Sequence, residues 1–94
     1  EILTVPDIDV FFIAPSDLSQ TMGHIGDAGH PEVLEAIDDG IAKIIAAGKV
    51  AGTLVNDASV EEYAQKGVQF LMTPWNAWVA RGAAAFVEKA NNAR

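Results

Sequence analysis

Residues 8–19 read Ile-Asp-Val-Phe-Phe-Ile-Ala-Pro-Ser-Asp-Leu-Ser. A strand is expected over 9–14, because a nearly continuous apolar run is typical of a parallel strand that is buried on both faces. Pro15 ends the run, and the carboxylate of Asp17 follows it at the start of a short helix expected near 17–22. In α/β enzymes, metal ligands and anion-binding groups lie where a parallel strand ends beside the positive end of a helix. Asp17 is therefore a candidate site residue.

The rest of the chain alternates between strand-like and helix-like patterns. Short apolar runs predict two more strands, at 50–55 and 68–73. Helical spacing of apolar side chains predicts helices at about 31–47, 58–66 and 76–90. In the first helix, the apolar residues with this spacing are Leu34, Ile37, Ile41, Ile44 and Ile45. Strands that alternate with helices form a parallel sheet with right-handed crossovers.

Three such strands make a poor free-standing sheet, because both faces are apolar and both edges are open. A (β/α)₈ barrel needs about 250 residues, whereas this chain has 94. We therefore expect an α/β fold in which residues 1–94 are the last three βα units of a TIM barrel. They would form the C-terminal part of a single domain.

Composition narrows the range of partners. The chain has 13 acidic and 6 basic residues and a net charge of -7, which argues against nucleic acid and anionic membranes as partners. It has no cysteine, so it has neither a disulfide nor a thiolate nucleophile. No apolar run approaches the roughly 20 residues of a membrane span, and the N-terminus lacks the features of a signal peptide. A cytoplasmic location is expected.

Three segments carry a resemblance to a known family. They are DVFFIAPSDLSQTMGHIG at 9–26, HPEV at 30–33 and AGKVAGTL at 47–54. Their wording resembles the C-terminal third of the HpcH/HpaI family of pyruvate-dependent class II aldolases, and the likeness extends from about Ile8 to Phe86. The resemblance implies strands six to eight of a TIM barrel. It also implies reversible cleavage of 4-hydroxy-2-oxoacids to pyruvate and an aldehyde, through a metal-stabilised enolate.

The resemblance also implies roles for three residues. Asp17 would ligate a divalent ion, Mg²⁺ or Mn²⁺ with Co²⁺ as a further possibility. Backbone N–H groups of Ser16 and Asp17 would hold the substrate carboxylate, and Leu54 would line the substrate pocket. The second metal-binding carboxylate, a glutamate, would lie upstream of Glu1, and Glu1 itself is not nominated. The family's base-assisting residues come from earlier strands, so no catalytic residue is assigned in this chain.

Two departures from the family wording bear on the substrate. Ala14 stands where glycine is usual, and the segment 74–76, Pro-Trp-Asn, replaces a smaller and more acidic loop. These changes keep open a citrate-lyase-like barrel that acts on another oxoacid or on an acyl-CoA thioester. A non-catalytic α/β module that binds a partner through its uncovered faces is the third alternative.

Several of these residues also have ordinary structural explanations. Asp17 and Ser16 are both common N-caps. His24 and His30 are six residues apart, which is not the spacing of a helical zinc-binding pair, so we interpret both as structural or surface residues. Trp75 and Trp78 are interpreted as packing residues. The family resemblance also implies a homo-oligomer in which the helix at 76–90 packs on a neighbouring subunit.

Overall fold

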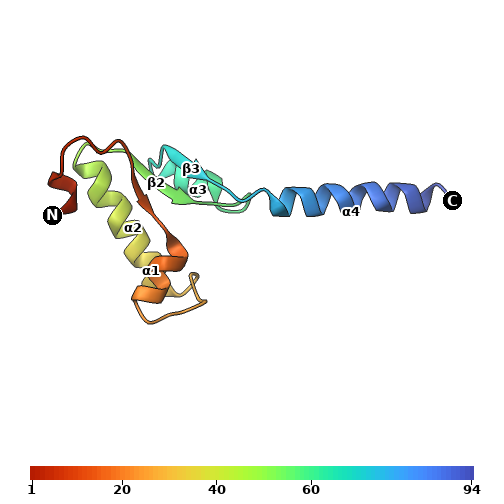
Figure 1. Ribbon diagram of the computed structural model, residues 1–94, viewed down its shortest axis with the longest axis horizontal. Coiled ribbons are helices and arrows are strands. Elements are labelled where there is room, and N and C mark those ends of the chain that lie inside the picture. Colours follow the sequence, from red (N-terminus) through yellow and green to blue (C-terminus); the bar gives the residue numbers. More distant parts are fainter.

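The computed structural model describes residues 1–94, and its elements alternate along the chain (Figure 1). In chain order they are the 3-10 helix η1 (Ile2–Thr4), β1 (Phe11–Ile13), α1 (Pro15–Thr21), α2 (Pro31–Ala46), β2 (Ala51–Leu54), α3 (Val60–Gln65), β3 (Phe70–Met72) and α4 (Asn76–Asn92).

The three strands form one parallel sheet in the order β1-β2-β3. This confirms the expected parallel α/β architecture. Phe11 pairs with Ala51, and Gly52 pairs with Phe70. Each strand is shorter than its expected apolar run: β1, β2 and β3 have three, four and three residues, whereas the sequence predicts strands over 9–14, 50–55 and 68–73.

The core lies between the sheet and α2. It consists of Phe11, Val33, Ile37, Ile41, Ile44, Ala51 and Val68, all less than a tenth exposed. One detail of the predicted helix face is wrong. Leu34 and Ile45 are 42% and 38% exposed, and Val33 is fully buried in their place. Val33, Ile37, Ile41 and Ile44 are spaced by four, four and three residues, so they share one stripe, whereas Leu34 lies at its border.

The other face of the sheet carries an aromatic contact across a glycine. The rings of Phe12 and Phe70 meet edge-to-face, with 6.1 Å between centroids. Gly52 lies between them in the sheet, and a Cβ there would be only 3.0 Å from Phe12 Cδ2 and from Phe70 Cδ1. Both rings are more than a third exposed. An apolar face of this kind is typical of one half of a larger core, such as a barrel interior.

The sheet is also open at the edge of β1. An apolar groove of about 490 Å³ lies there, next to η1 and α2. Among the residues that line it are Ile2, Ile8, Val10, Phe12 and Ile44. An open strand edge with apolar surface beside it is a surface that proteins normally cover, so this groove agrees with the expectation of further βα units before β1.

The end of α2 follows the pattern that its sequence predicts. Gly48 has φ +75°, a left-handed conformation that glycine adopts without strain. Its N–H donates to the carbonyl of Ile45 at 2.9 Å, and the Lys49 N–H donates to the carbonyl of Ile44 at 3.1 Å. These bonds satisfy the last carbonyls of the helix and turn the chain into β2.

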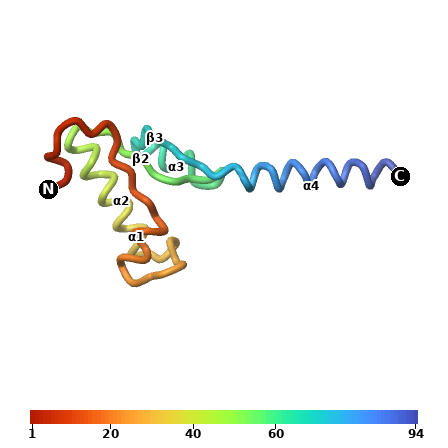
Figure 2. Tube along the Cα trace, in the orientation of Figure 1, coloured from red at the N-terminus to blue at the C-terminus, as the bar shows by residue number.

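Helix α4 points away from the rest of the chain (Figures 1 and 2). It contains no buried residue, and its apolar side chains Val79, Phe86 and Val87 are 53%, 74% and 54% exposed. Its side-chain hydrogen bonds to the other elements come from Trp78 and Arg81, and both go to Asp57. The structure contains no helix with the length and apolar character needed to cross a membrane.

Candidate functional site

The carboxyl ends of the three strands lie at one edge of the sheet, because all three run parallel. Thr53 strengthens this edge, since its hydroxyl donates to the carbonyl of Ile13 at 2.9 Å and the side chain is fully buried. Helix α1 begins at Pro15, two residues after β1 ends. The loops after parallel strands are where α/β barrels place their sites, so the start of α1 belongs to that region.

Asp17 lies in the first turn of α1 and is exposed. The N-cap residue of this helix is Ala14, which provides no side-chain acceptor, so neither Asp17 nor Ser16 is the N-cap. The Asp17 side chain forms no hydrogen bond and no ion pair within the chain. Its carboxylate oxygens are therefore available to a ligand.

The backbone around Asp17 is partly unpaired. The first turn of a helix leaves its N–H groups without acceptors inside the helix, and the N–H groups of Ser16 and Asp17 have no acceptor elsewhere in the chain. Their carbonyls are used, since Ser19 Oγ donates to that of Ser16 at 2.7 Å and Thr21 Oγ1 to that of Asp17 at 3.0 Å. These bonds fix the turn and leave two N–H donors free beside the Asp17 carboxylate.

Leu54 ends the neighbouring strand β2 and is 37% exposed. The register pairs Thr53 with Ile13, so Leu54 comes next to Ala14 at the entry to α1. Its side chain points to the same face as Gly52, since residues two apart in a strand share a face. The structure thus brings all three predicted residues, Ser16, Asp17 and Leu54, to one edge of the sheet.

The donor set at this edge can be compared with the needs of a divalent ion. Hard cations such as Mg²⁺ take six or more oxygen ligands, of which one or two are protein carboxylates. The unpartnered Asp17 carboxylate fits one of these positions. Asp17 belongs to no group of three metal-ligating side chains, so the residues of this chain do not by themselves complete a cation site there.

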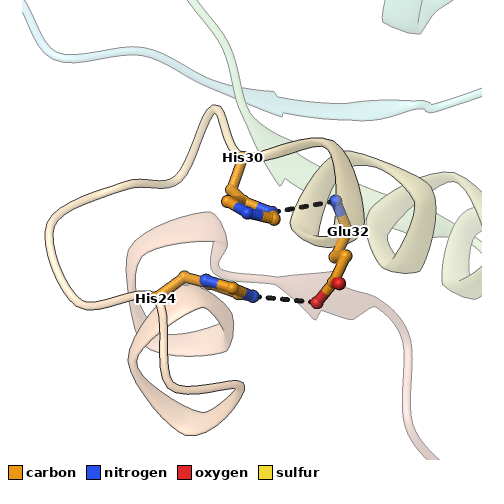
Figure 3. Close-up of side chains that lie close together, drawn as sticks. All are labelled: His24, His30 and Glu32. Atoms are coloured by element: carbon orange, nitrogen blue, oxygen red, sulfur yellow. Dashed lines mark hydrogen bonds and ion pairs between the residues drawn. The ribbon is translucent and has the colours of Figure 1, made fainter.

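A second cluster lies in the loop between α1 and α2 (Figure 3). His24 Nε2 is 2.9 Å from Glu32 Oε2, and the rings of His24 and His30 stack with 3.7 Å between centroids. His30 is the N-cap of α2, because its Nδ1 accepts the Glu32 backbone N–H at 3.1 Å. Both histidines thus have structural contacts, which agrees with their interpretation from the sequence. The contacts between them were not predicted.

This cluster changes the acidity of Glu32. The hydrogen bond from His24, together with the positive charge that His24 and His30 carry when protonated, lowers the pKa of Glu32 below its usual value. Because the folded-state pKa is lowered, the contribution of Glu32 to stability is present above its unfolded pKa and is lost as the pH falls through the folded value.

Replacement of His24 tests this pKa shift. In the metal-free protein, His24→Ala should move the pKa of Glu32 back up toward 4.5, its unperturbed value. The measurement is the pH titration of the Glu32 side-chain carboxyl carbon by NMR. Glu35, for comparison, should titrate equally in both proteins, since it has no contact with His24. A Glu32 midpoint that is unaffected by the substitution would contradict the contact in Figure 3.

A third set of contacts joins the loop after β2 to α4. Asp57 accepts a hydrogen bond from Trp78 Nε1 at 3.0 Å and pairs with the Arg81 guanidinium. The hydrogen bonds from Trp78 and Arg81 lower the pKa of the Asp57 carboxyl. Trp78 remains 48% exposed. Its role here is to hold the start of α4 rather than to fill a core.

Comparison with known proteins identifies the family. The family model described as HpcH/HpaI aldolase/citrate lyase matches residues 1–77. The chain belongs to the HpcH/HpaI aldolase/citrate lyase family. This confirms the family that segments 9–26, 30–33 and 47–54 indicate.

Curated relatives in this family carry aldolase names. The chain is 47% identical over 72 residues to the hydroxypyruvate/pyruvate aldolase of Roseovarius nubinhibens, covering 76% of this chain and 28% of that protein. It is 41% identical over 91 residues to the 4-hydroxy-2-oxo-heptane-1,7-dioate aldolase of Klebsiella pneumoniae, covering 95% of this chain and 34% of that protein. The chain therefore spans about a third or less of the curated relatives it matches.

Solved structures of the family share this fold. A HpcH/HpaI aldolase/citrate lyase family protein from Burkholderia cenocepacia matches with a TM-score of 0.84 and 27% identity, over 96% of this chain and 36% of that one. A HpcH/HpaI aldolase from Desulfitobacterium hafniense matches with a TM-score of 0.74 and 26% identity, over 90% of this chain and 36% of that one. The expected fold class is confirmed, and the three βα units are a piece of the family's TIM barrel.

Proposed function

We propose that the complete protein is a metal-dependent aldolase, a carbon–carbon lyase that reversibly cleaves 4-hydroxy-2-oxoacids to pyruvate and an aldehyde. The observation that carries the proposal is the exposed, unpartnered carboxylate of Asp17 at the carboxyl end of β1, within the segment that matches the family. The aldolase names of the curated relatives support this reaction class.

Asp17 would be one protein ligand to Mg²⁺, Mn²⁺ or Co²⁺, and a carboxylate from the preceding part of the barrel would be another. When bound, the ion would supply Lewis-acid polarisation of the substrate's keto oxygen. Asp17 is suited to this task because its oxygens accept no competing hydrogen bond. Its position in a first helical turn fixes its direction relative to β1.

Ser16, Asp17 and Leu54 would hold the oxoacid itself. The free N–H groups of Ser16 and Asp17 point out of the first turn of α1, where a carboxylate is favoured by both hydrogen bonding and the helix dipole. Leu54 would supply an apolar wall beside them, since it ends the adjacent strand and stays partly exposed. Together these groups would orient the oxoacid for cleavage of its carbon–carbon bond.

The site would be complete only with the N-terminal part of the barrel, which would cover the open edge of β1. We also propose a homo-oligomer in which α4 packs on a neighbouring subunit. The exposed apolar side chains of α4 and its direction away from the sheet support this assembly (Figure 2). The lack of cysteine agrees with a cytoplasmic protein.

Proton exchange of pyruvate tests the proposal without requiring the aldehyde. The complete protein in D₂O, with Mg²⁺ or Mn²⁺, should exchange the methyl protons of pyruvate, and proton NMR measures the rate. A chelator should abolish the exchange, because it removes the group that stabilises the developing negative charge. Absence of metal-dependent exchange would reject the proposed chemistry.

One observation keeps a second candidate in view. Trp75 follows the carboxyl end of β3 and is 67% exposed, so the rim of the site differs from the small loop of the family wording. A citrate-lyase-like barrel that acts on another oxoacid or an acyl-CoA thioester would suit this rim. Turnover of a malyl-type thioester without turnover of hydroxy-oxoacids would favour this candidate.

A further inference from the structure

We propose that His24, His30 and Glu32 form a second metal site, which takes a divalent transition-metal ion of the zinc class. Each of the three side chains offers one ligand atom, and these atoms all lie within 4.8 Å of one another (Figure 3). Asp17 is not a member of this cluster.

The donor set defines which ions would bind. Two imidazole nitrogens and one carboxylate oxygen suit Zn²⁺, Co²⁺, Ni²⁺ and Cu²⁺, whereas Mg²⁺ and Ca²⁺ prefer oxygen ligands alone. The all-oxygen site proposed at Asp17 favours Mg²⁺ and Mn²⁺, although it would also accept Co²⁺. The protein would therefore hold two kinds of ion in two places, and an excess of Mg²⁺ would not compete for the histidine site.

The backbone holds the three ligands in place. The His24 N–H donates to the carbonyl of Ser19 at 2.7 Å, which fixes His24 to the end of α1. The His30 N–H donates to the carbonyl of Asp27 at 3.1 Å, and the first turn of α2 carries Glu32. Little backbone movement is needed to bring the side chains to one ion, so the entropic cost of assembling the site is low.

The present contacts show which bonds an ion would replace. The 2.9 Å hydrogen bond between His24 Nε2 and Glu32 Oε2 would be replaced by two bonds to the ion, and these two atoms would move apart to about 3.4 Å, the separation of two ligands on a tetrahedral ion with bonds of about 2.1 Å. An ion lies in the plane of each ring that binds it, so the near-parallel rings cannot bind one ion while stacked. The His30 ring must therefore rotate out of the stack before one of its nitrogens can bind the ion.

Rotation of the His30 ring breaks one hydrogen bond. Nδ1 of His30 now accepts the Glu32 backbone N–H, and this N–H would pass to water, which reaches it because the start of α2 is exposed. The negative charge of Glu32 offsets the unfavourable approach of a cation to the positive end of the helix. Occupation of the site would connect the start of the loop after α1, at His24, to the start of α2, and thereby restrict the loop.

Cobalt titration of the complete protein tests the site. The protein, stripped of metal by a chelator and held in excess Mg²⁺, is titrated with Co²⁺, which is followed by visible absorption and calorimetry. We expect a Co²⁺ site that is present in the Asp17→Asn variant, and is therefore separate from any Co²⁺ bound at Asp17; its imidazole ligands bind in their neutral form. Its absorption spectrum should indicate nitrogen ligands.

Matched variants separate this site from the Asp17 site and from folding. His24→Ala should abolish the Co²⁺ site and Glu32→Gln should weaken it at least tenfold, whereas Glu35→Gln and Asp17→Asn should leave it unchanged. His30→Asn should also abolish the site while keeping an N-cap acceptor for α2, so its loss cannot be assigned to a missing cap.

Two outcomes would overturn the inference. One is Co²⁺ binding of unchanged affinity when His24→Ala is added to Asp17→Asn. The other is no binding below millimolar Co²⁺ in the wild-type protein, which would mean that the three side chains form a hydrogen-bonded cluster only. Neither outcome bears on the proposed aldolase function, because pyruvate exchange with Mg²⁺ is measured separately and does not involve His24.

Discussion

The Asp17→Ala variant of the complete protein is expected to lose its metal-dependent pyruvate exchange and aldol cleavage by a factor of about 100 or more. Outer-shell partners of metal ligands already cost about 10–100-fold when replaced, and a direct ligand should cost more. The quantity to measure is kcat/KM at saturating Mg²⁺ or Mn²⁺. The metal concentration that gives the half-maximal rate should be measured as well, and it should rise in the variant. Alanine leaves the helix in place and removes both ligand oxygens.

The fold should tolerate this change. The Asp17 carboxylate is exposed and makes no hydrogen bond or ion pair, and alanine favours helices, so the unfolding temperature should stay within a few degrees. Asp27→Ala is a matched control, since Asp27 is also an exposed aspartate without a side-chain partner, in the loop between α1 and α2. Full activity in Asp17→Ala, or an equal loss in Asp27→Ala, would reject Asp17 as the metal ligand.

The sequence predicts well the position of residues that lie at or just after the end of a strand. Asp17 follows the strand β1 by four residues, so its position at the carboxyl edge follows from strand direction alone. Leu54 reaches the same edge for the same reason, because β2 runs parallel to β1. These placements rest on local patterns and on the chirality of βα units, and neither requires knowledge of side-chain contacts.

Contacts across loops were not predictable in this way. His24, His30 and Glu32 meet only because the intervening loop turns back on itself, with glycines in left-handed conformations at positions 23 and 26. Asp57 meets Trp78 and Arg81 across 21 and 24 residues. Hydrophobic periodicity carries no information on such polar contacts. A signal was available only in the residue types, two histidines and a glutamate within nine positions.

The burial of α2 shows a related limit. Spacing correctly predicts a helix, and the structure places it at Pro31–Ala46. The border of the apolar stripe that faces the sheet depends on the rotation of α2 about its own axis. That rotation is set by the packing of α2 against Phe11, Ala51 and Val68. The buried side chain is therefore Val33 rather than Leu34.

The same packing makes Ile37 the side chain whose truncation should cost most stability. Ile37 is 1% exposed and lies at the centre of the stripe of α2 that packs on the sheet. Ile37→Ala should lower the free energy of unfolding by about 2–5 kcal/mol, and Ile37→Val by about 0.5–1.5 kcal/mol, because both the transfer energy and the cavity scale with the atoms removed. Urea unfolding of the complete protein, with the slope m compared between variants, measures both values.

Ile25→Ala is the control for this series, since Ile25 lies in the loop between α1 and α2 and is 76% exposed. It should change stability by no more than about 0.5 kcal/mol. Close packing between α2 and the sheet predicts a graded loss in the free energy of unfolding. The loss should be largest for Ile37→Ala, intermediate for Ile37→Val and close to zero for Ile25→Ala. If Ile37→Ala cost no more than Ile25→Ala, α2 would not cover this face of the sheet. The placement of α1 against α2 would then need revision as well, because α1 packs on the same helix.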